Sequence, residues 1–339
     1  MIRPLAVSLG DPAGIGPELI AEAWIRRAAE RLPPFFVCGG IGTLMEAARA
    51  RGLRPWLTHV EDPQAALDAF ERGDCLPVLG DMSAGYHPGA PDETGGWLAL
   101  ESLKLATRLA VEGSAAGVVT GPIAKAELAK VGFTFPGQTE FVADACGVPA
   151  DDAVMMLAGP QLRTVPLTVH CALAEVSGRL TVDLICRRVR VVDAAMKADF
   201  GIPAPRIAVC GLNPHAGESG RMGREEIEVI KPALAALRAE GIDATGPHPA
   251  DTLFAPHLRP TYDVAIAMYH DQALVPLKTL DFDQGVNVTL GLPVVRTSPD
   301  HGTAFDIAGK GIASPNAMIA AIRMAGEMAA RRAQETLGA

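Results

Sequence analysis

In the first part of the chain, short apolar runs alternate with longer stretches in which apolar residues have helical spacing. The short runs predict strands at 4–10, 35–40 and 117–121. Apolar residues recur on one helical face in the stretches between them, at 17–32, 41–52 and 96–113. This alternation predicts an α/β protein with a mostly parallel, doubly wound sheet.

The middle of the chain has a different pattern. Two extended runs around a Gly-Pro turn predict a hairpin over 153–170, and a long helix is expected over about 171–200. The remaining predicted elements are strands at 207–212, 263–269 and 287–292, a helix at 224–241 and a final helix starting at Ser314 and Pro315. We therefore expect two intimate lobes, with 1–130 plus 285–339 in the first and 131–284 in the second.

Three of the predicted strands end on a histidine. His170 ends the hairpin, His215 follows the strand at 207–212, and His270 follows the strand at 263–269. Ligands of open α/β sheets bind beyond the carboxyl ends of the strands. Three neutral imidazoles suit Zn²⁺ or a similar transition metal, although a lone histidine at a strand end more often only caps or packs. The histidines at 59, 87, 248 and 257 lie in turn-like surroundings and are not expected to be ligands.

Candidate anion-binding groups lie elsewhere in the chain. The glycine-rich turn at 8–18 opens a helix and can direct backbone N–H groups at an anion, but it lacks the GxGxxG dinucleotide fingerprint. Lys278 and Arg296 carry the charges that a phosphate or carboxylate requires. Arg296 follows an apolar run, so it is less expected than Lys278 to be an ordinary solvent-exposed charge.

Composition narrows the function classes. The 339 residues carry a net charge of −9, so no overall positive field attracts nucleic acid or an anionic membrane. The six cysteines form no CxxC pair, and no apolar run is long enough for a membrane span or signal peptide. These features predict buried free thiols and a soluble, cytoplasmic protein.

Several motifs occur in order over most of the chain. They are GDPAGIGPE at 10–18, TGPIAKAEL at 120–128, PGQTEF at 136–141, GLNPHAGESGRMGREE at 211–226, GPHPADTLF at 246–254, YHDQALVPLK at 269–278 and GVNVTLGLPVVRTSPDHGTAFDIAGKG at 285–311. Together they resemble the 4-hydroxythreonine-4-phosphate dehydrogenase family of pyridoxal phosphate biosynthesis. The loop that starts at His301 also resembles the NAD loop of isopropylmalate and isocitrate dehydrogenases, which bind their metal through aspartates.

The resemblance implies an isopropylmalate dehydrogenase-like fold and a homodimer with active sites at the subunit interface. It places the dinucleotide loop in the first lobe, and the metal histidines and the dimer interface in the second. It implies NAD or NADP as oxidant and one divalent ion (zinc, magnesium or cobalt) held by His170, His215 and His270, with two of them from one subunit and one from the partner. The implied reaction is oxidation and decarboxylation of the phosphorylated small molecule 4-phosphooxy-L-threonine to 3-amino-2-oxopropyl phosphate.

The resemblance also assigns residues to ligands. It implies substrate contacts by Gln138, Thr139, Lys278, Asn287 and Arg296. It implies a dinucleotide region that includes His301, Gly302, Thr303, Asp306 and Gly309. Asp251, Asp271 and Lys278 stay open as candidates for the general base.

One position departs from the family pattern, which often has histidine where this chain has Gln138. Glutamine can donate and accept hydrogen bonds but cannot carry a proton charge. A related dehydrogenase of threonate or erythronate 4-phosphate is therefore the alternative, and more distant relatives act on dihydrodiol carboxylates. A metal-dependent hydrolase or a non-catalytic phosphosugar-binding protein fits less well, since neither explains both the dinucleotide loop and the histidines.

Overall fold

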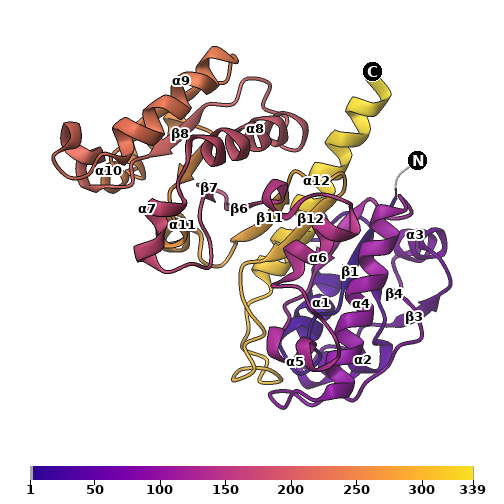
Figure 1. Ribbon diagram of the computed structural model, residues 1–339. Coiled ribbons are helices and arrows are strands. Elements are labelled where there is room, and N and C mark those ends of the chain that lie inside the picture. The colour runs from indigo at the N-terminus through magenta and orange to yellow at the C-terminus, as the bar shows by residue number, and fades with distance from the viewer. Residues whose placement is uncertain (1–2, 339) are drawn as a thin grey trace. The chain divides into compact units, whose positions relative to one another are not determined.

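The computed structural model describes residues 3–338 of the chain. It divides into two compact units, which are Met1–Ala150 with Leu292–Ala330, and Asp151–Gly291 with Arg331–Ala339. The colours of Figure 1 show that the first unit joins the indigo start of the chain to the yellow segment near its end. Within the described part, no helix combines the length and the apolar character that a membrane crossing needs.

The first unit contains a fully parallel sheet. Its strands run in the order β3, β4, β2, β1, β5, β12, and each is parallel to its neighbour. Their bounds are β1 Leu5–Ser8, β2 Phe35–Cys38, β3 Leu57–Val60, β4 Leu76–Leu79, β5 Gly117–Thr120 and β12 Val295–Pro299. The predicted strands at 4–10, 35–40 and 117–121 are confirmed as β1, β2 and β5.

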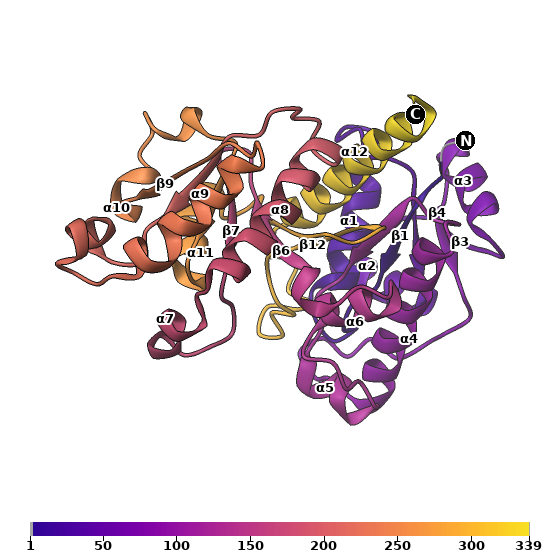
Figure 2. The same cartoon turned by 45° about the horizontal axis from the view of Figure 1, so that its top comes forward.

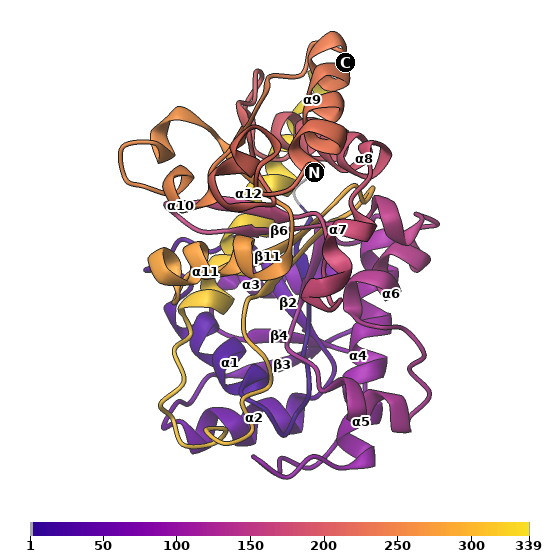
Figure 3. The same ribbon diagram turned by 60° about the vertical axis from the view of Figure 1, so that its left-hand side comes forward.

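Helices cover both faces of this sheet, because strands buried on two sides need apolar cover on each. Figure 3 shows α1 and α2 on one side of the strands and α4 on the other. The helices of this unit are α1 Gly16–Arg26, α2 Ile41–Ala50, α3 Pro63–Arg72, α4 Glu93–Val111, α5 Lys125–Lys130, α6 Gln138–Ala145 and the start of α12 Asn316–Gly338. Helix α12 begins two residues later than predicted, and Ser314 Oγ accepts a bond of 3.4 Å from the N–H of its first residue, Asn316.

The second unit has a mixed sheet in the order β11, β6, β7, β10, β8, β9. The pairs β11–β6 and β6–β7 are antiparallel, which confirms the predicted hairpin, whereas β7, β10, β8 and β9 are mutually parallel. The bounds are β6 Val154–Ala158, β7 Arg163–Pro166, β8 Ile207–Cys210, β9 Ala244–His248, β10 Val264–Ala267 and β11 Val286–Leu290. The predicted mostly parallel α/β fold is thus confirmed in both units.

The helices of the second unit are α7 Val176–Arg179, α8 Val182–Ala198, α9 Lys231–Ala239, α10 Ala250–Leu253 and α11 His270–Asp281. Figure 2 shows α8 and α9 lying close together. The predicted continuous helix at 171–200 is wrong. The chain turns extended at Leu180, and Thr181 then caps α8 by accepting a bond from Leu184 N, because a hydroxyl at this position satisfies a free helix N–H.

The predicted helix at 224–241 also differs in its first half. A π-helical turn, η4 Glu226–Ile230, precedes α9. Pro232 lies in the first turn of α9 and has no N–H to give to the preceding turn, which loosens the helical hydrogen-bond pattern there.

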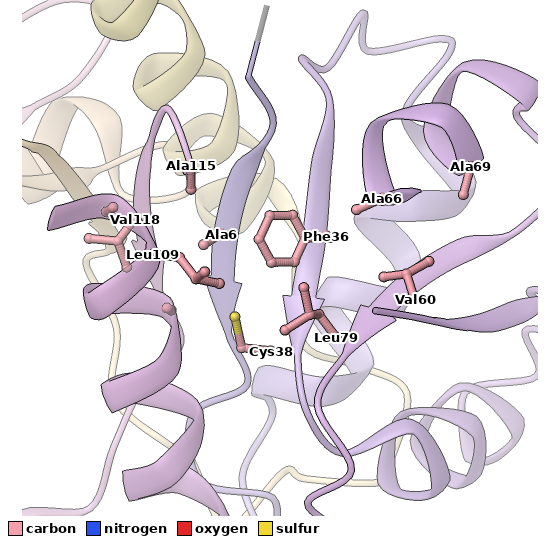
Figure 4. Close-up of a cluster of buried hydrophobic side chains, with 12 residues drawn as sticks. Ala6, Phe36, Cys38, Val60, Ala66, Ala69, Leu79, Leu109, Ala115 and Val118 are labelled. Atoms are coloured by element: carbon pink, nitrogen blue, oxygen red, sulfur yellow. The ribbon is translucent and has the colours of Figure 1, made fainter. Parts of the chain in front are cut away.

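The sheet of the first unit is anchored by a cluster of buried apolar side chains, drawn in Figure 4. Phe36 on β2 lies at its centre, between Ala6 on β1 and Ala66 on α3. Ala6, Phe36 and Ala66 have no solvent exposure. The small alanine side chains allow close packing of the helix on the sheet, and the Phe36 ring fills the space between Ala6 and Ala66.

Replacing Phe36 by alanine should remove most of this packing. Phe36→Ala is expected to lower the free energy of unfolding by about 3–5 kcal/mol, measured by urea denaturation, because it leaves a cavity in a close-packed core. The matched control is Trp56→Ala, since the Trp56 side chain is 79% exposed. The control should change stability by no more than about 0.5 kcal/mol. Equal losses in the two variants would contradict this assignment of the core.

Candidate functional site

Three neighbouring parallel strands of the second unit deliver the three histidines to one sheet edge. His170 follows β7, His270 follows β10 and His215 follows β8, and these strands are adjacent in the order β7, β10, β8. Asp251 lies in α10 just after β9, the next parallel strand. The carboxyl ends of parallel strands meet at one edge, so the fold places these four residues along the same rim.

Polar side chains that the sequence analysis missed tie these strand ends together. Thr168 Oγ1 donates to Met268 O at 2.9 Å, which joins the ends of β7 and β10. Gln272 accepts a bond from Met268 N at 2.7 Å and donates to Gly211 O at 2.9 Å, which joins the ends of β10 and β8. Both act across strands that are far apart in sequence, so no local pattern could have indicated them.

The backbone is strained at two of the three histidines. His170 and His215 have φ of 51° and 52°, a left-handed conformation that side chains with a Cβ rarely adopt. For His215 it begins a run through Ser219, within η3 Pro214–Gly220, in which every residue has a positive φ. Such conformations cost free energy and are found preferentially at functional sites, so the strain favours a functional role for both histidines.

A buried carboxylate holds the strained run after β8. Glu226 is 2% exposed, and its Oε1 accepts a bond from Asn213 N at 2.7 Å. Its Oε2 accepts from Asn213 Nδ2 at 3.0 Å, and a Cβ on Gly217 would lie 2.5 Å from that same oxygen. The loop that carries His215 is therefore folded around Glu226, which the sequence analysis did not single out.

The structure brings two of the histidines close together, with their ring planes tilted by 41°. The rings of His170 and His270 have centroids 6.1 Å apart. His270 Nδ1 shares a hydrogen bond of 2.7 Å with Asp271 Oδ1, which leaves Nε2 as the ring nitrogen available to a ligand. Among the described residues of one chain, however, no three His, Cys, Asp or Glu side chains are grouped so that they could hold a metal ion. A single chain thus supplies a pair of imidazoles but no complete set of three.

The other candidates of the second unit lie on nearby elements. Lys278 is half-buried on α11, the helix that begins with His270. Asn287 is on β11, and its Oδ1 is buried without a hydrogen-bond partner. Two of the discounted histidines are not in turns as expected: His59 is in β3 next to Asp81, and His248 ends β9.

The first unit contains a second polar cluster, centred on Arg296 of β12. Arg296 is only 3% exposed. Its Nη2 donates to Thr120 Oγ1 at 2.8 Å and to Gln138 Oε1 at 3.3 Å, and its Nη1 donates to Thr139 Oγ1 at 3.3 Å. Burial lowers the pKa of Arg296 to about 10, against a smaller opposing effect of Glu140. The group still carries its charge at neutral pH.

Gln138 has two roles at this cluster. Its Nε2 donates to Gly121 O at 3.0 Å while its Oε1 accepts from Arg296. A neutral amide can do both at once, so Gln138 orients the guanidinium without adding a charge. Three of the predicted substrate residues, Gln138, Thr139 and Arg296, are therefore in mutual contact.

The predicted dinucleotide region forms an irregular loop of the first unit. Thr303 O accepts a bond from Ile15 N at 2.9 Å, so the loop lies against the glycine-rich turn before α1. His301 Nδ1 lies 3.0 Å from Gly302 O, and Asp306 is exposed. Gly309 has a φ of 74°, and a Cβ there would lie 2.8 Å from Pro88. The close packing against Pro88 explains the glycine.

Comparison with known proteins places this arrangement among α/β enzymes of the dehydrogenase class. The chain belongs to the family described as pyridoxal phosphate biosynthetic protein PdxA, whose model matches residues 32–325. The predicted resemblance to this family is confirmed.

Individual relatives agree with this assignment. The chain is 62% identical over 331 residues to a 4-hydroxythreonine-4-phosphate dehydrogenase from Erythrobacter litoralis, covering 98% of each chain. A crystal structure of the enzyme of that name from Klebsiella pneumoniae is 39% identical with a TM-score of 0.86, covering 97% of this chain and 98% of the other. A terephthalate 1,2-cis-dihydrodioldehydrogenase from Burkholderia xenovorans is 30% identical with a TM-score of 0.65, covering 96% of this chain and 98% of the other.

The loop around Glu226 should loosen when its carboxylate is neutralised. In Glu226→Gln, amide hydrogen exchange across 213–223 should accelerate by at least ~10-fold, because charge-assisted bonds worth roughly 1.5–3 kcal/mol are lost. The measurement is hydrogen exchange followed by mass spectrometry. Glu228→Gln is the control, since the Glu228 side chain is 57% exposed and pairs with Arg224. The same exchange rates in both variants would show that Glu226 does not brace the loop.

Proposed function

We propose that this protein oxidises and decarboxylates 4-phosphooxy-L-threonine, with NAD or NADP as the oxidant, to give 3-amino-2-oxopropyl phosphate for pyridoxal 5′-phosphate biosynthesis. The observation that carries the proposal is the Arg296 cluster in a chain 62% identical to a relative of the corresponding name. A buried guanidinium held by side-chain acceptors is a specific receptor for a phosphate group.

The way Arg296 is held supports phosphate recognition. Thr120, Thr139 and Gln138 fix the plane of the guanidinium, so binding an anion loses little side-chain entropy. Burial strengthens the attraction between the cation and a phosphate, because little water screens the charges. The assignment of Lys278 and Asn287 to the same substrate stays a prediction from the family resemblance.

The proposed ligands of a divalent ion are His170, His215 and His270. The imidazole donors fit such an ion, since the rings of His170 and His270 lie 6.1 Å apart at the ends of neighbouring strands. A divalent ion held by these residues would supply Lewis acidity for the oxidation and the decarboxylation. The nicotinamide supplies the oxidant by accepting a hydride.

The residues of the chain then have to move a proton and orient the substrate. Asp271 holds the His270 ring through Nδ1, which favours a positioning role over a role as base. Asp251 is exposed at the same rim and Lys278 lies on α11, so these two are the remaining candidates for the base that removes the hydroxyl proton.

A homodimer with shared sites explains the incomplete histidine set. Large apolar side chains are exposed close in sequence to two of the histidines: Leu173 is 70% exposed and Val275 is 62% exposed. Exposed apolar groups around a functional rim favour burial against a partner. We infer that His170 and His270 of one chain meet His215 of a second copy. A cytoplasmic location stays a prediction.

Two alternative activities differ in their support. A dehydrogenase of threonate or erythronate 4-phosphate needs the same phosphate receptor, and Gln138 leaves this substrate open. A metal-dependent hydrolase has no use for the loop at 301–313, and family membership disfavours it. Product analysis after incubation with NAD⁺ and each phosphorylated acid separates these possibilities.

Removing the phosphate receptor should selectively damage the phosphorylated substrate. Arg296→Ala is expected to lower kcat/KM at least ~10-fold, because a charge-assisted hydrogen bond is worth roughly 1.5–3 kcal/mol. With 4-hydroxy-L-threonine, which lacks phosphate, wild type and variant should differ far less. For the wild-type enzyme, kcat/KM should fall as pH rises through about 10, where Arg296 loses its proton.

The control is Arg323→Ala, which removes an arginine of the same unit that pairs with Glu30. It should leave kcat/KM for both substrates near the wild-type value. An equal loss for both substrates in Arg296→Ala would show that Arg296 serves the fold or the cofactor instead.

Mixing inactive variants tests the shared metal site. His215→Ala and His170→Ala should each lose bound metal and turnover, measured by elemental analysis and by NADH absorbance. After joint unfolding and refolding of an equal mixture, about a quarter of wild-type activity should return, since half of the dimers are mixed and each has one intact site. Refolded single variants are the control. If no activity returns on mixing, the two histidines do not come from different subunits.

A further inference from the structure

A buried ionic network in the first unit connects α1 and α2 to the loop at 301–313. We call it the Arg51 network; it consists of Glu18, Glu22 and Arg51. Glu18 and Glu22 are four residues apart on α1, so both carboxylates lie on one face of the helix. Arg51 follows the last residue of α2, and its side chain is only 8% exposed.

The guanidinium of Arg51 contacts both carboxylates. Nη1 lies 3.5 Å from Glu18 Oε2, and Nε donates to Glu22 Oε2. Glu18 has no solvent exposure and Glu22 is 7% exposed. A buried carboxylate is tolerated only where a countercharge or hydrogen bonds stabilise it, and Arg51 supplies a countercharge to both Glu18 and Glu22.

The same arginine also holds the loop. Arg51 Nη2 donates to Ala313 O at 2.6 Å, at the end of the loop. Glu18 lies close to the loop as well: burial raises its pKa, while the charge of Arg51 and the nearby backbone N–H of Gly309 lower it. The network thus binds the loop at Ala313 and lies beside it at Gly309.

A second segment packs on Gly309 from the side of Tyr86 and Pro88. The Tyr86 hydroxyl would lie 3.5 Å from a Cβ at Gly309, and Pro88 would lie 2.8 Å from it. The next residue, Gly89, donates its N–H to Ala13 O at 2.8 Å. The charges of Glu18 and Arg51 also act on the pKa of Tyr86, after burial itself, so the hydroxyl lies near the network. The loop therefore lies between the Arg51 network and the segment that contains Tyr86 and Pro88.

We propose that the Arg51 network is a positioning device for the loop at 301–313 and thereby sets the affinity of the enzyme for its nicotinamide dinucleotide. The inference rests on the proposed function, because that function assigns the loop to the dinucleotide. As positioning residues, the three members of the network would act through the loop. Preorganisation of a binding loop raises affinity because less ordering entropy is lost on binding.

The first test measures the loop without any ligand. Lys310 is exposed between Gly309 and Gly311, so trypsin cleavage after Lys310 reports opening of the loop. Arg51→Lys keeps a positive charge but cannot reach Glu18, Glu22 and Ala313 at once. Cleavage after Lys310 should be at least ~5-fold faster in this variant, because loss of about 1 kcal/mol of loop stabilisation corresponds to that factor.

The second test measures dinucleotide binding in the same variant. The Kd for NADH and for NADPH, followed by NADH fluorescence, should rise by ~5-fold or more, while the KM for the phosphorylated substrate changes less than ~2-fold. The matched control is Arg49→Lys, an exposed arginine in the same helix, which should change neither measurement. A larger change in the Kd for the dinucleotide than in the KM for the phosphorylated substrate separates a loop effect from general destabilisation. Thermal melting followed by circular dichroism checks the overall stability of each variant.

The outcomes distinguish the inference from the function on which it rests. If the wild-type enzyme binds NADH but Arg51→Lys binds it equally well, or is cleaved no faster after Lys310, the positioning role is wrong. If the wild-type enzyme binds neither NADH nor NADPH, the proposed dehydrogenase function fails at that step, before the variant is considered. Faster cleavage together with weaker NADH binding supports the proposal.

Discussion

Parallel pairing of β7, β10 and β8 is the constraint on which the candidate site depends. It brings His170, His215 and His270 to the same edge of one sheet, although His170 and His270 are a hundred residues apart in the chain. Hydrogen bonds from Thr168 and Gln272 then fix the strand ends against each other. Without this pairing the three histidines would not share one sheet edge.

Buried charges do much of the remaining positioning. Glu226 stabilises the left-handed run that carries His215, Arg296 organises the proposed phosphate receptor, and Arg51 binds the end of the predicted dinucleotide loop. In each case the charged group is buried and its hydrogen bonds come from segments distant in sequence. Interactions of this kind are strong because they are shielded from water, and they also select one arrangement of the loops over others.

Several elements could be predicted because their signals are local. The strands at β1, β2 and β5 are short apolar runs, and the hairpin of β6 and β7 is announced by its Gly-Pro turn. Elements with weak local signals were missed. The helix α11 contains Pro276 and begins directly at His270, so its sequence gives no clear start or periodicity. Instead, α11 is stabilised by the hydrogen bond between the Gln272 amide and Met268 N and by its packing on β7 and β10.

The sequence alone determined the α/β class, the three strand-end histidines and the family, because hydrophobic periodicity and ordered motifs are properties of the linear chain. Only the tertiary structure decided which strands are neighbours, that Arg296 contacts Thr120, Thr139 and Gln138, and that Glu226 lies under the His215 loop. It also decided that one chain pairs the rings of His170 and His270. The physical reason is that such contacts join residues 13 to 176 positions apart. Their energy depends on burial and distance, which local pattern does not encode.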